Sequence, residues 1–253
     1  MVLIAYHNDL ILKQRLQAHL QVHHDRDEIV QGTYWEDGKG CAVGCSLQSL
    51  AEIKGDLDFD GHDNHELYES LMGVPVVLAE LEDRIFESLP NGEAKQWPLD
   101  FAAAIQPGAD LSGVWNHIGL WLLADQKYGV VWRTEARSPQ RKAIQRVMAL
   151  YRRQIAGDYP SFDEWRAAAW AAEAAAKAAE VAAWVAEAAA RAAWVAEAAA
   201  RESFWRALAA KMLEFMRAAP MAGVGDEEGF RWTSNHPIDR GIAMPVCDHC
   251  EPC

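Results

Sequence analysis

The stretch from Ser161 to Pro220 reads SFDEWRAAAWAAEAAAKAAEVAAWVAEAAARAAWVAEAAARESFWRALAAKMLEFMRAAP, and the predicted fold depends on it. Alanine makes up 22 of the 34 residues from Ala167 to Ala200, and no glycine or proline interrupts the stretch before Pro220. Alanine is the best helix former because it loses no side-chain entropy and buries no polar group. The composition therefore predicts one long helix over residues 161–219.

Both ends of this helix carry recognisable signals. Ser161 and Glu164 have the spacing of a capping box, and Pro220 followed by Gly223 marks the stop. A continuous helix over residues 162–219 would be about 87 Å long, about twice the diameter of a compact chain of this size. The helix must therefore project or break, with 201–203 as one conceivable break. Because no glycine or proline intervenes, we expect a continuous, projecting helix.

The predicted helix has two unlike faces. One face is almost entirely alanine and includes Ala189, so a second copy of the chain or the N-terminal domain is expected to cover it closely. The other face combines charged residues with tryptophans. These tryptophans indicate either ordinary core packing or an exposed aromatic platform for a partner protein. The candidate partner-binding tryptophans are Trp170, Trp184, Trp194 and Trp205.

Composition limits the classes of function. The chain has 253 residues and a net charge of −13, which argues against nucleic acid as an electrostatic ligand. We find no signal peptide and no apolar run long enough to cross a membrane. Five cysteines in two clusters indicate a reducing compartment, so we expect a cytoplasmic protein with no membrane contact.

The first 157 residues predict an all-α domain of short helices joined by glycine and proline loops. Asn8 or Asp9 is expected to cap the first helix. Further helices are expected from Pro75 to about Ser88, from Pro98, after Asp110 or Ser112, and from Ser138 to Ala156, with residues 129–132 extended. The predicted domain division is a helical domain over 1–157, the long helix over 161–219 and a loop-rich cysteine tail over 220–253.

The most distinctive part of the first domain is the segment GTYWEDGKGCAVGC, which is expected to be a tight glycine loop. Cys41 in this loop is a candidate nucleophile, with His23 or His24 as its base. The alternative is that Cys41 and Cys45 are small buried residues that pack a turn. His19 and His23 share a helix face and are a weaker candidate pair for one metal ion.

The C-terminal tail contains a second cysteine cluster. Cys247 and Cys250 form one CxxC spacing, which Cys253 extends, and His249 lies between them. One pair supplies half of a tetrahedral zinc site, so Cys41 and Cys45 are the candidate second pair. The alternative is a loose tail without a folded metal site. The segment from Asp56 begins like a calcium loop but has Leu67 where the loop requires glutamate, so we interpret it as an acidic loop.

The helix expected over 138–156 has a basic outer face that includes Lys142, Arg146 and Arg153. In an acidic protein such a face commonly pairs with acidic surface of the same molecule. The alternative is a binding site for an anion.

The segments HHDRDEIVQGTYWEDGKGCAVGC and GVPVVLAELEDRIFESLPNGEAKQWPLDFAAAIQPGADLSGVW, followed by the alanine-rich repeat, resemble a family of uncharacterised bacterial and phage-borne proteins. The resemblance covers about residues 1–219 and implies a bacterial or phage setting, with no activity to carry over.

We therefore expect a non-enzymatic factor that binds a host protein, or itself, through its acidic surface and its Ala/Trp helix. No complete catalytic motif is present. The alternatives are an enzyme with Cys41 as nucleophile and a zinc-binding protein that uses both cysteine pairs.

Overall fold

The computed structural model describes residues 3–56, 64–171 and 194–223, and these are mostly helical, as predicted. The helices are α1 (Leu10–Asp25), α2 (Ala42–Lys54), α3 (Leu67–Met72), α4 (Val76–Ser88), α5 (Asn91–Ala104), α6 (Val114–Ala124), α7 (Pro139–Ile155) and α9 (Trp194–Arg217), with 3-10 turns η1 (Ala5–Asn8) and η2 (Val130–Arg133). Residues 162–171 are also helical. The strands β1 (Trp35–Glu36) and β2 (Lys39–Gly40) form a short antiparallel hairpin.

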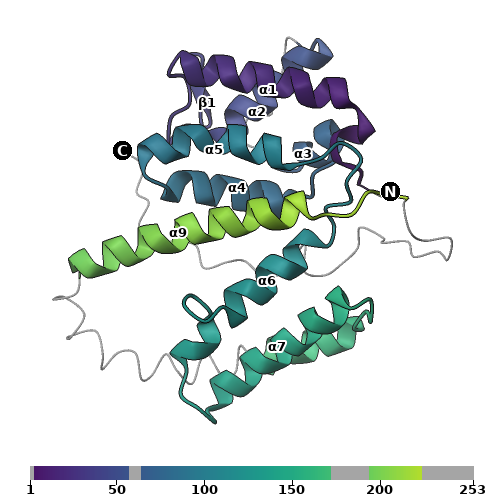
Figure 1. Ribbon diagram of the computed structural model, residues 1–253, viewed down its shortest axis with the longest axis vertical. Helices are drawn as coiled ribbons and strands as arrows, with labels where there is room; N and C mark the ends of the chain where they lie inside the picture. The colour runs from purple at the N-terminus through teal and green to yellow at the C-terminus, as the bar shows by residue number, and fades with distance from the viewer. Residues whose placement is uncertain (1–2, 57–63, 172–193, 224–253) are drawn as a thin grey trace.

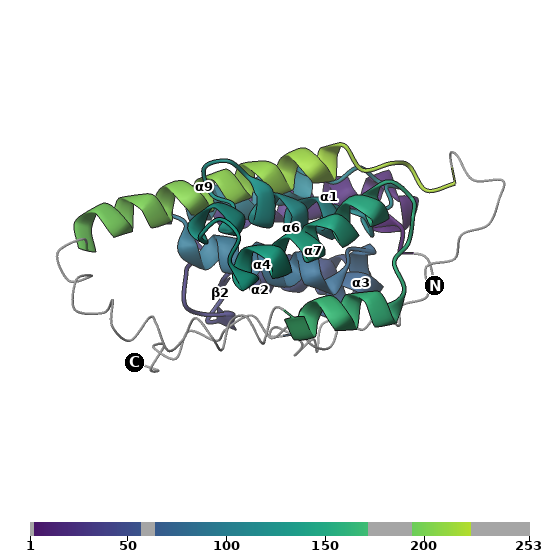
Figure 2. The same cartoon turned by 90° about the horizontal axis from the view of Figure 1, so that it is seen from below.

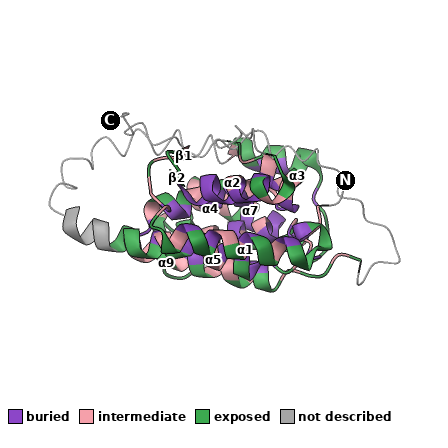
Figure 3. Cartoon of the chain, turned by 90° about the horizontal axis from the view of Figure 1, so that it is seen from above, coloured by how far each residue is buried: buried purple, intermediate pink, exposed green. Residues whose placement is uncertain are grey.

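The larger core lies between helices α1, α2, α4 and α5, which pack side by side (Figure 1). Their apolar side chains recur at helical spacing, so each helix turns one stripe inward. Figure 3 shows buried positions gathered on α2 and α4 in the middle, while the outer faces of α1 and α9 are exposed. The largest fully buried side chains of this core include Tyr6, Tyr68, Phe86 and Phe101.

Helix α9 is part of this core. Leu208, Met212 and Met216 are buried against α4, α5 and α6. Near its middle, Phe204 stacks on Trp121 of α6 with ring centroids 6.3 Å apart. The second half of the predicted long helix is therefore fixed on the N-terminal domain.

A smaller second core joins α6 to α7 and to residues 162–171. Its centre is formed by Leu150, Tyr151, Trp165 and Ala168. We call residues 130–171, which lie on the far side of α6 from α1 and α5, the α7 lobe (Figure 1).

The two described ends of the predicted long helix run in opposite directions. In both Figure 1 and Figure 2 the chain passes leftward through residues 162–171 and rightward through α9. Because the residues between these two ends are not described, the continuity of the predicted long helix stays a prediction. No break occurs at 201–203, because α9 is continuous there. Residues 172–193 lie outside the described part of the chain.

Most local signals were interpreted correctly. The Asp9 carboxylate caps α1 by accepting from the Ile11 and Leu12 amides, and Ser138 caps α7. The capping box also forms, because Ser161 N donates to Glu164 Oε2 at 2.8 Å and Glu164 N donates to Ser161 Oγ at 3.3 Å.

Three local predictions were wrong. Pro98 lies inside α5, which already begins at Asn91, and residues 130–133 form a 3-10 turn where an extended piece was expected. Helix α6 begins after Gly113 without a side-chain cap, while the Asp110 carboxylate accepts from the Ser112 amide. No helix within the described ranges is long and apolar enough to span a membrane.

Candidate functional site

The glycine–cysteine segment forms a hairpin and the start of a helix, which differs from the loop that was expected. Cys41 is the N-cap of α2, and its sulfur accepts from the Gly44 amide at 3.4 Å. Gly44 lies so close to the hairpin that a Cβ there would fall 1.6 Å from the Tyr34 carbonyl oxygen. The glycine is therefore required for close packing of the hairpin on α2.

Both cysteines of this segment are buried. Burial raises the pKa of Cys41 well above its ordinary value, and the nearby Asp83 carboxylate adds to the effect. Burial also raises the pKa of Cys45 to about 12, and the Cys45 thiol donates to the Gly40 carbonyl at 3.4 Å. A nucleophilic cysteine needs exposure and a lowered pKa, so this geometry supports the packing alternative.

The histidines proposed as bases are each engaged elsewhere. The His23 ring pairs with Glu28, with 2.6 Å between Nδ1 and Oε2, and meets Trp35 edge to face. His24 lies beside Asp25 at 3.3 Å. No hydrogen bond within the described ranges joins either ring to Cys41.

The predicted metal sites receive no support from the described residues. His19 pairs with Glu52 at 3.4 Å, while His23 pairs with Glu28. Within the described ranges no group of three potential metal ligands comes together. The tail residues Cys247, His249, Cys250 and Cys253 and the acidic loop over 57–63 lie outside those ranges. The shared zinc site therefore stays a prediction.

Two groups of polar residues in the described core were not predicted from the sequence. Asp83 lies 3.5 Å from both the His65 ring and the Tyr34 hydroxyl, beside the start of α2. Deeper in the core, neither Glu82 carboxylate oxygen nor the Tyr68 hydroxyl has a hydrogen-bond partner of good geometry among the described residues. Asp83 and Glu82 of α4 meet residues that are far away in the chain. No local sequence pattern therefore identifies either group.

Burial raises the pKa of Glu82 to about 8. The neighbouring Tyr68 hydroxyl lowers it somewhat without reaching hydrogen-bond geometry, and Asp83 raises it again. Glu82 thus holds its proton at neutral pH. Both Glu82 and Tyr68 are fully buried, so we regard this pair as part of the core.

The proposed partner-binding tryptophans have different environments. Trp170 is 64% exposed, whereas Trp205 is half-buried and packs against the main core. Trp194 begins α9 and its side chain is not described, and Trp184 and Ala189 lie outside the described ranges. Of the four candidates, Trp170 has a side chain that is available to a partner.

Trp170 belongs to an exposed stack of three side chains on residues 162–171. The Arg166 guanidinium lies 5.1 Å from the Phe162 ring centroid and 5.3 Å from that of Trp170. These residues are four apart and therefore follow one face of the helix. Phe162 is 48% exposed and Arg166 is exposed. We call these three residues the aromatic stack.

The α7 lobe is rich in exposed apolar side chains. Six of the ten exposed large hydrophobic residues lie in it, although it holds 42 of the 186 residues whose burial is described. The six are Val130, Trp132, Ile155, Tyr159, Phe162 and Trp170. Exposed apolar side chains are therefore more frequent in this lobe than in the rest of the described chain.

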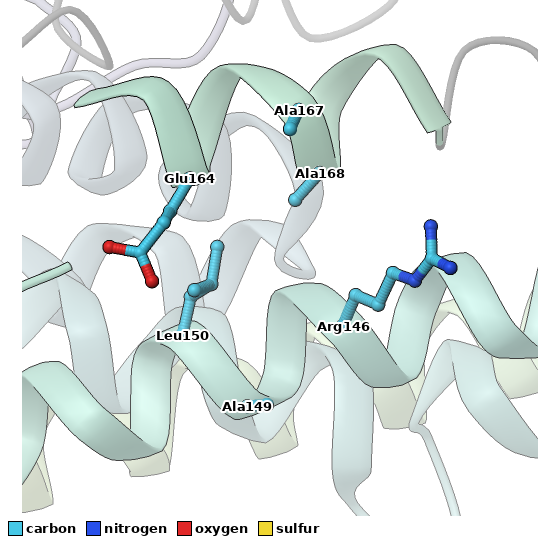
Figure 4. A pocket seen from close by; sticks show the side chains of 6 residues that line it. All are labelled: Arg146, Ala149, Leu150, Glu164, Ala167 and Ala168. Carbon is cyan, nitrogen blue, oxygen red and sulfur yellow. The ribbon is translucent and has the colours of Figure 1, made fainter. Parts of the chain in front are cut away.

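A shallow groove lies on another face of this lobe, between α7 and residues 162–171 (Figure 4). The two helices run antiparallel, and Arg146 and Glu164 lie at opposite ends of the groove. The alanine side chains between them are small and therefore leave the groove open. The lining residues are Arg146, Ala149, Leu150, Glu164, Ala167 and Ala168.

Charge is segregated along the chain. Residues 1–129 contain 21 acidic and 8 basic residues, whereas residues 130–155 contain 7 basic residues and 1 acidic residue. Within the described ranges Arg153 is paired with Asp158 and Glu164, but Lys142, Arg146 and Arg152 form no ion pair. We expected this basic face to pair with acidic residues of the same molecule. Of these four basic residues, only Arg153 does so within the described ranges.

Comparison with protein-family models, with curated proteins and with solved structures finds no match for this chain. The resemblance to an uncharacterised bacterial and phage-borne family therefore stays an expectation.

Proposed function

We propose that this protein is a non-enzymatic interaction factor that binds a partner protein through the α7 lobe, in a bacterial or phage-infected cytoplasm. The observation that carries the proposal is the aromatic stack of Phe162, Arg166 and Trp170. Tryptophan and arginine are over-represented among the residues that dominate protein–protein binding energy.

The stack has the physical properties of a binding surface. Its rings remain in water in the isolated chain, so contact with a partner would remove apolar area from solvent. Arg166 holds both rings, which reduces the side-chain entropy lost on binding. The smaller core beneath it fixes residues 162–171 on α7 through Trp165.

The acidic character of residues 1–129 supports a protein as the partner. With 21 acidic and 8 basic residues, this part of the chain repels the phosphate backbone of nucleic acid. We therefore infer that nucleic acid is not the principal ligand. The partner bound by this lobe is either a different protein or a second copy of the same chain.

Affinity purification with matched variants tests the function. The wild-type chain and the double variant Phe162→Ala, Trp170→Ala would be compared in host cells, with Leu10→Ala, Ile11→Ala as the control. Leu10 and Ile11 are 55% and 59% exposed on α1, so the control removes similarly exposed apolar side chains. We expect a stoichiometric partner with the wild type and the control and its loss from the stack variant. Equal recovery by all three proteins would refute the proposed surface.

A further inference from the structure

The groove between α7 and residues 162–171 lies on a different face from the aromatic stack, and it contains a positive charge that no described residue compensates. Glu164 at one end is already engaged, since it accepts from Arg153 and from the Ser161 amide. Arg146 at the other end has no ion pair or hydrogen bond among the described residues. Lys142, one turn earlier on α7, is likewise exposed and unpaired within those residues.

The floor of the groove suits a helix. Ala149, Ala167 and Ala168 line it, and Leu150 adds apolar surface. Small residues let helix axes approach to near the ~8 Å lower limit of helix packing. An extended peptide would instead need unpaired backbone groups of a strand, which two flanking helices do not offer.

We propose that this groove binds a helical segment of a partner protein that presents small apolar residues to the alanine floor and a carboxylate to Arg146. Arg146 lines the groove and Lys142 lies one turn earlier on α7, and neither is paired with a described residue, so charge complementarity favours an acidic partner. The inference goes beyond the proposed function, because it concerns a separate surface and names the chemistry of its ligand.

The test uses three fluorescent probes and the full-length chain. The first is an alanine-rich helical peptide with a glutamate in each turn, the second has lysine at those positions, and the third is an oligothymidylate of the same charge as the first. We expect the acidic peptide to bind the wild type, with an affinity that falls as salt is added. Arg146→Glu should weaken that binding at least about tenfold and improve binding of the lysine peptide.

Two further variants make the result specific. Arg15→Glu changes the net charge equally at an exposed position of α1 and should leave the affinity unchanged. Ala149→Leu should fill the floor and abolish binding while the α-helical circular dichroism stays that of the wild type. The double variant Phe162→Ala, Trp170→Ala should bind the acidic peptide normally, so failure of the stack and failure of the groove are distinguishable.

Several outcomes would overturn the proposal. Binding of the oligothymidylate in place of the acidic peptide would identify a phosphate site. If Arg146→Glu and Arg15→Glu weakened binding of the acidic peptide equally, the loss would reflect the overall charge of the protein and not the groove. Absence of binding by any probe would mean that the groove does not receive a free helix. Self-association that Ala149→Leu abolishes would assign the groove to a second copy of the chain.

Discussion

Tyr151 and Trp165 meet at an angle of 66° with ring centroids 5.0 Å apart, and this contact fixes the start of the alanine-rich stretch on α7. Both rings are nearly buried, although they lie on either side of a glycine turn at Gly157. The first turns of the predicted long helix are therefore part of the α7 lobe. The aromatic stack and the groove both depend on this attachment.

Replacing Trp165 by alanine should destabilise the lobe. Trp165 is 8% exposed, and truncating a buried tryptophan costs about 3–5 kcal/mol. We expect a loss near the lower end of that range, because the smaller core can partly collapse. Trp170→Ala, five residues away and 64% exposed, should change the free energy of unfolding by less than about 0.5 kcal/mol. Chemical denaturation followed by circular dichroism measures both, and equal losses would contradict the described packing.

Glu82 should make the stability of the protein depend on pH. Its folded-state pKa of about 8 exceeds the ordinary value of 4.5, so the folded chain holds a proton that the unfolded chain has released. Its contribution to stability is therefore fully present below about pH 4.5 and is lost as the pH rises through about 8. Glu82→Gln should flatten this dependence and stabilise the protein at pH 8 by an amount on the order of a few kcal/mol.

The measurement for Glu82 is the denaturation midpoint from pH 5 to pH 9. Glu80→Gln, at an exposed position of the same helix, is the control and should keep the wild-type pH dependence. A wild-type profile in the Glu82→Gln variant would show that Glu82 is ionised in the folded state.

Cys41 and Cys45 should react slowly with thiol reagents in the folded protein. Both thiols are buried and have raised pKa values, so labelling requires local opening. Peptide-level mass spectrometry after timed alkylation at neutral pH distinguishes them from the three cysteines of the tail. We expect labelling on the order of 100-fold slower than in denaturant. Rapid labelling of Cys41, together with an activity that Cys41→Ala abolishes, would favour the enzyme hypothesis.

The capping box should contribute to the acid sensitivity of the α7 lobe. Hydrogen bonds from Arg153 and then from Ser161 lower the pKa of Glu164 to about 2, below its ordinary value of 4.5. The stability that Glu164 contributes is therefore present above pH 4.5 and is lost as the pH falls toward 2. The helical signal of Glu164→Gln should change less over that range than that of the wild type. The exposed Glu135→Gln serves as control, and identical acid titrations of all three proteins would contradict the contribution of the capping box.

Much of the secondary structure could be predicted because its signals are local. Asp9, Ser138 and the Ser161–Glu164 pair mark helix starts through hydrogen bonds that span only a few residues. Pro98 misled the prediction, because proline favours a first turn but here lies buried inside α5, where packing outweighs its backbone cost. The cysteine segment was predicted to be a loop because its glycines were taken as turn residues. Gly44 instead lies in a helix, where the absence of a side chain lets the hairpin pack closely.

The candidate site was only partly predictable. Trp170 was identified from its face on the helix, but its partners Phe162 and Arg166 became evident from their distances. The groove depends on the antiparallel pairing of α7 with residues 162–171, and the buried Glu82 depends on contacts between segments far apart in the chain. Neither arrangement produces a periodic pattern in the sequence.

Site-specific photo-crosslinking in host cells is the most direct test of the α7 lobe as a protein-binding surface. A photoreactive phenylalanine analogue would replace Trp170 in one protein and the similarly exposed Ile11 of α1 in another. We predict a discrete crosslink to a second polypeptide from position 170 and none from position 11. Crosslinks of equal yield from both positions, or none from position 170 while the chain is folded, would contradict it.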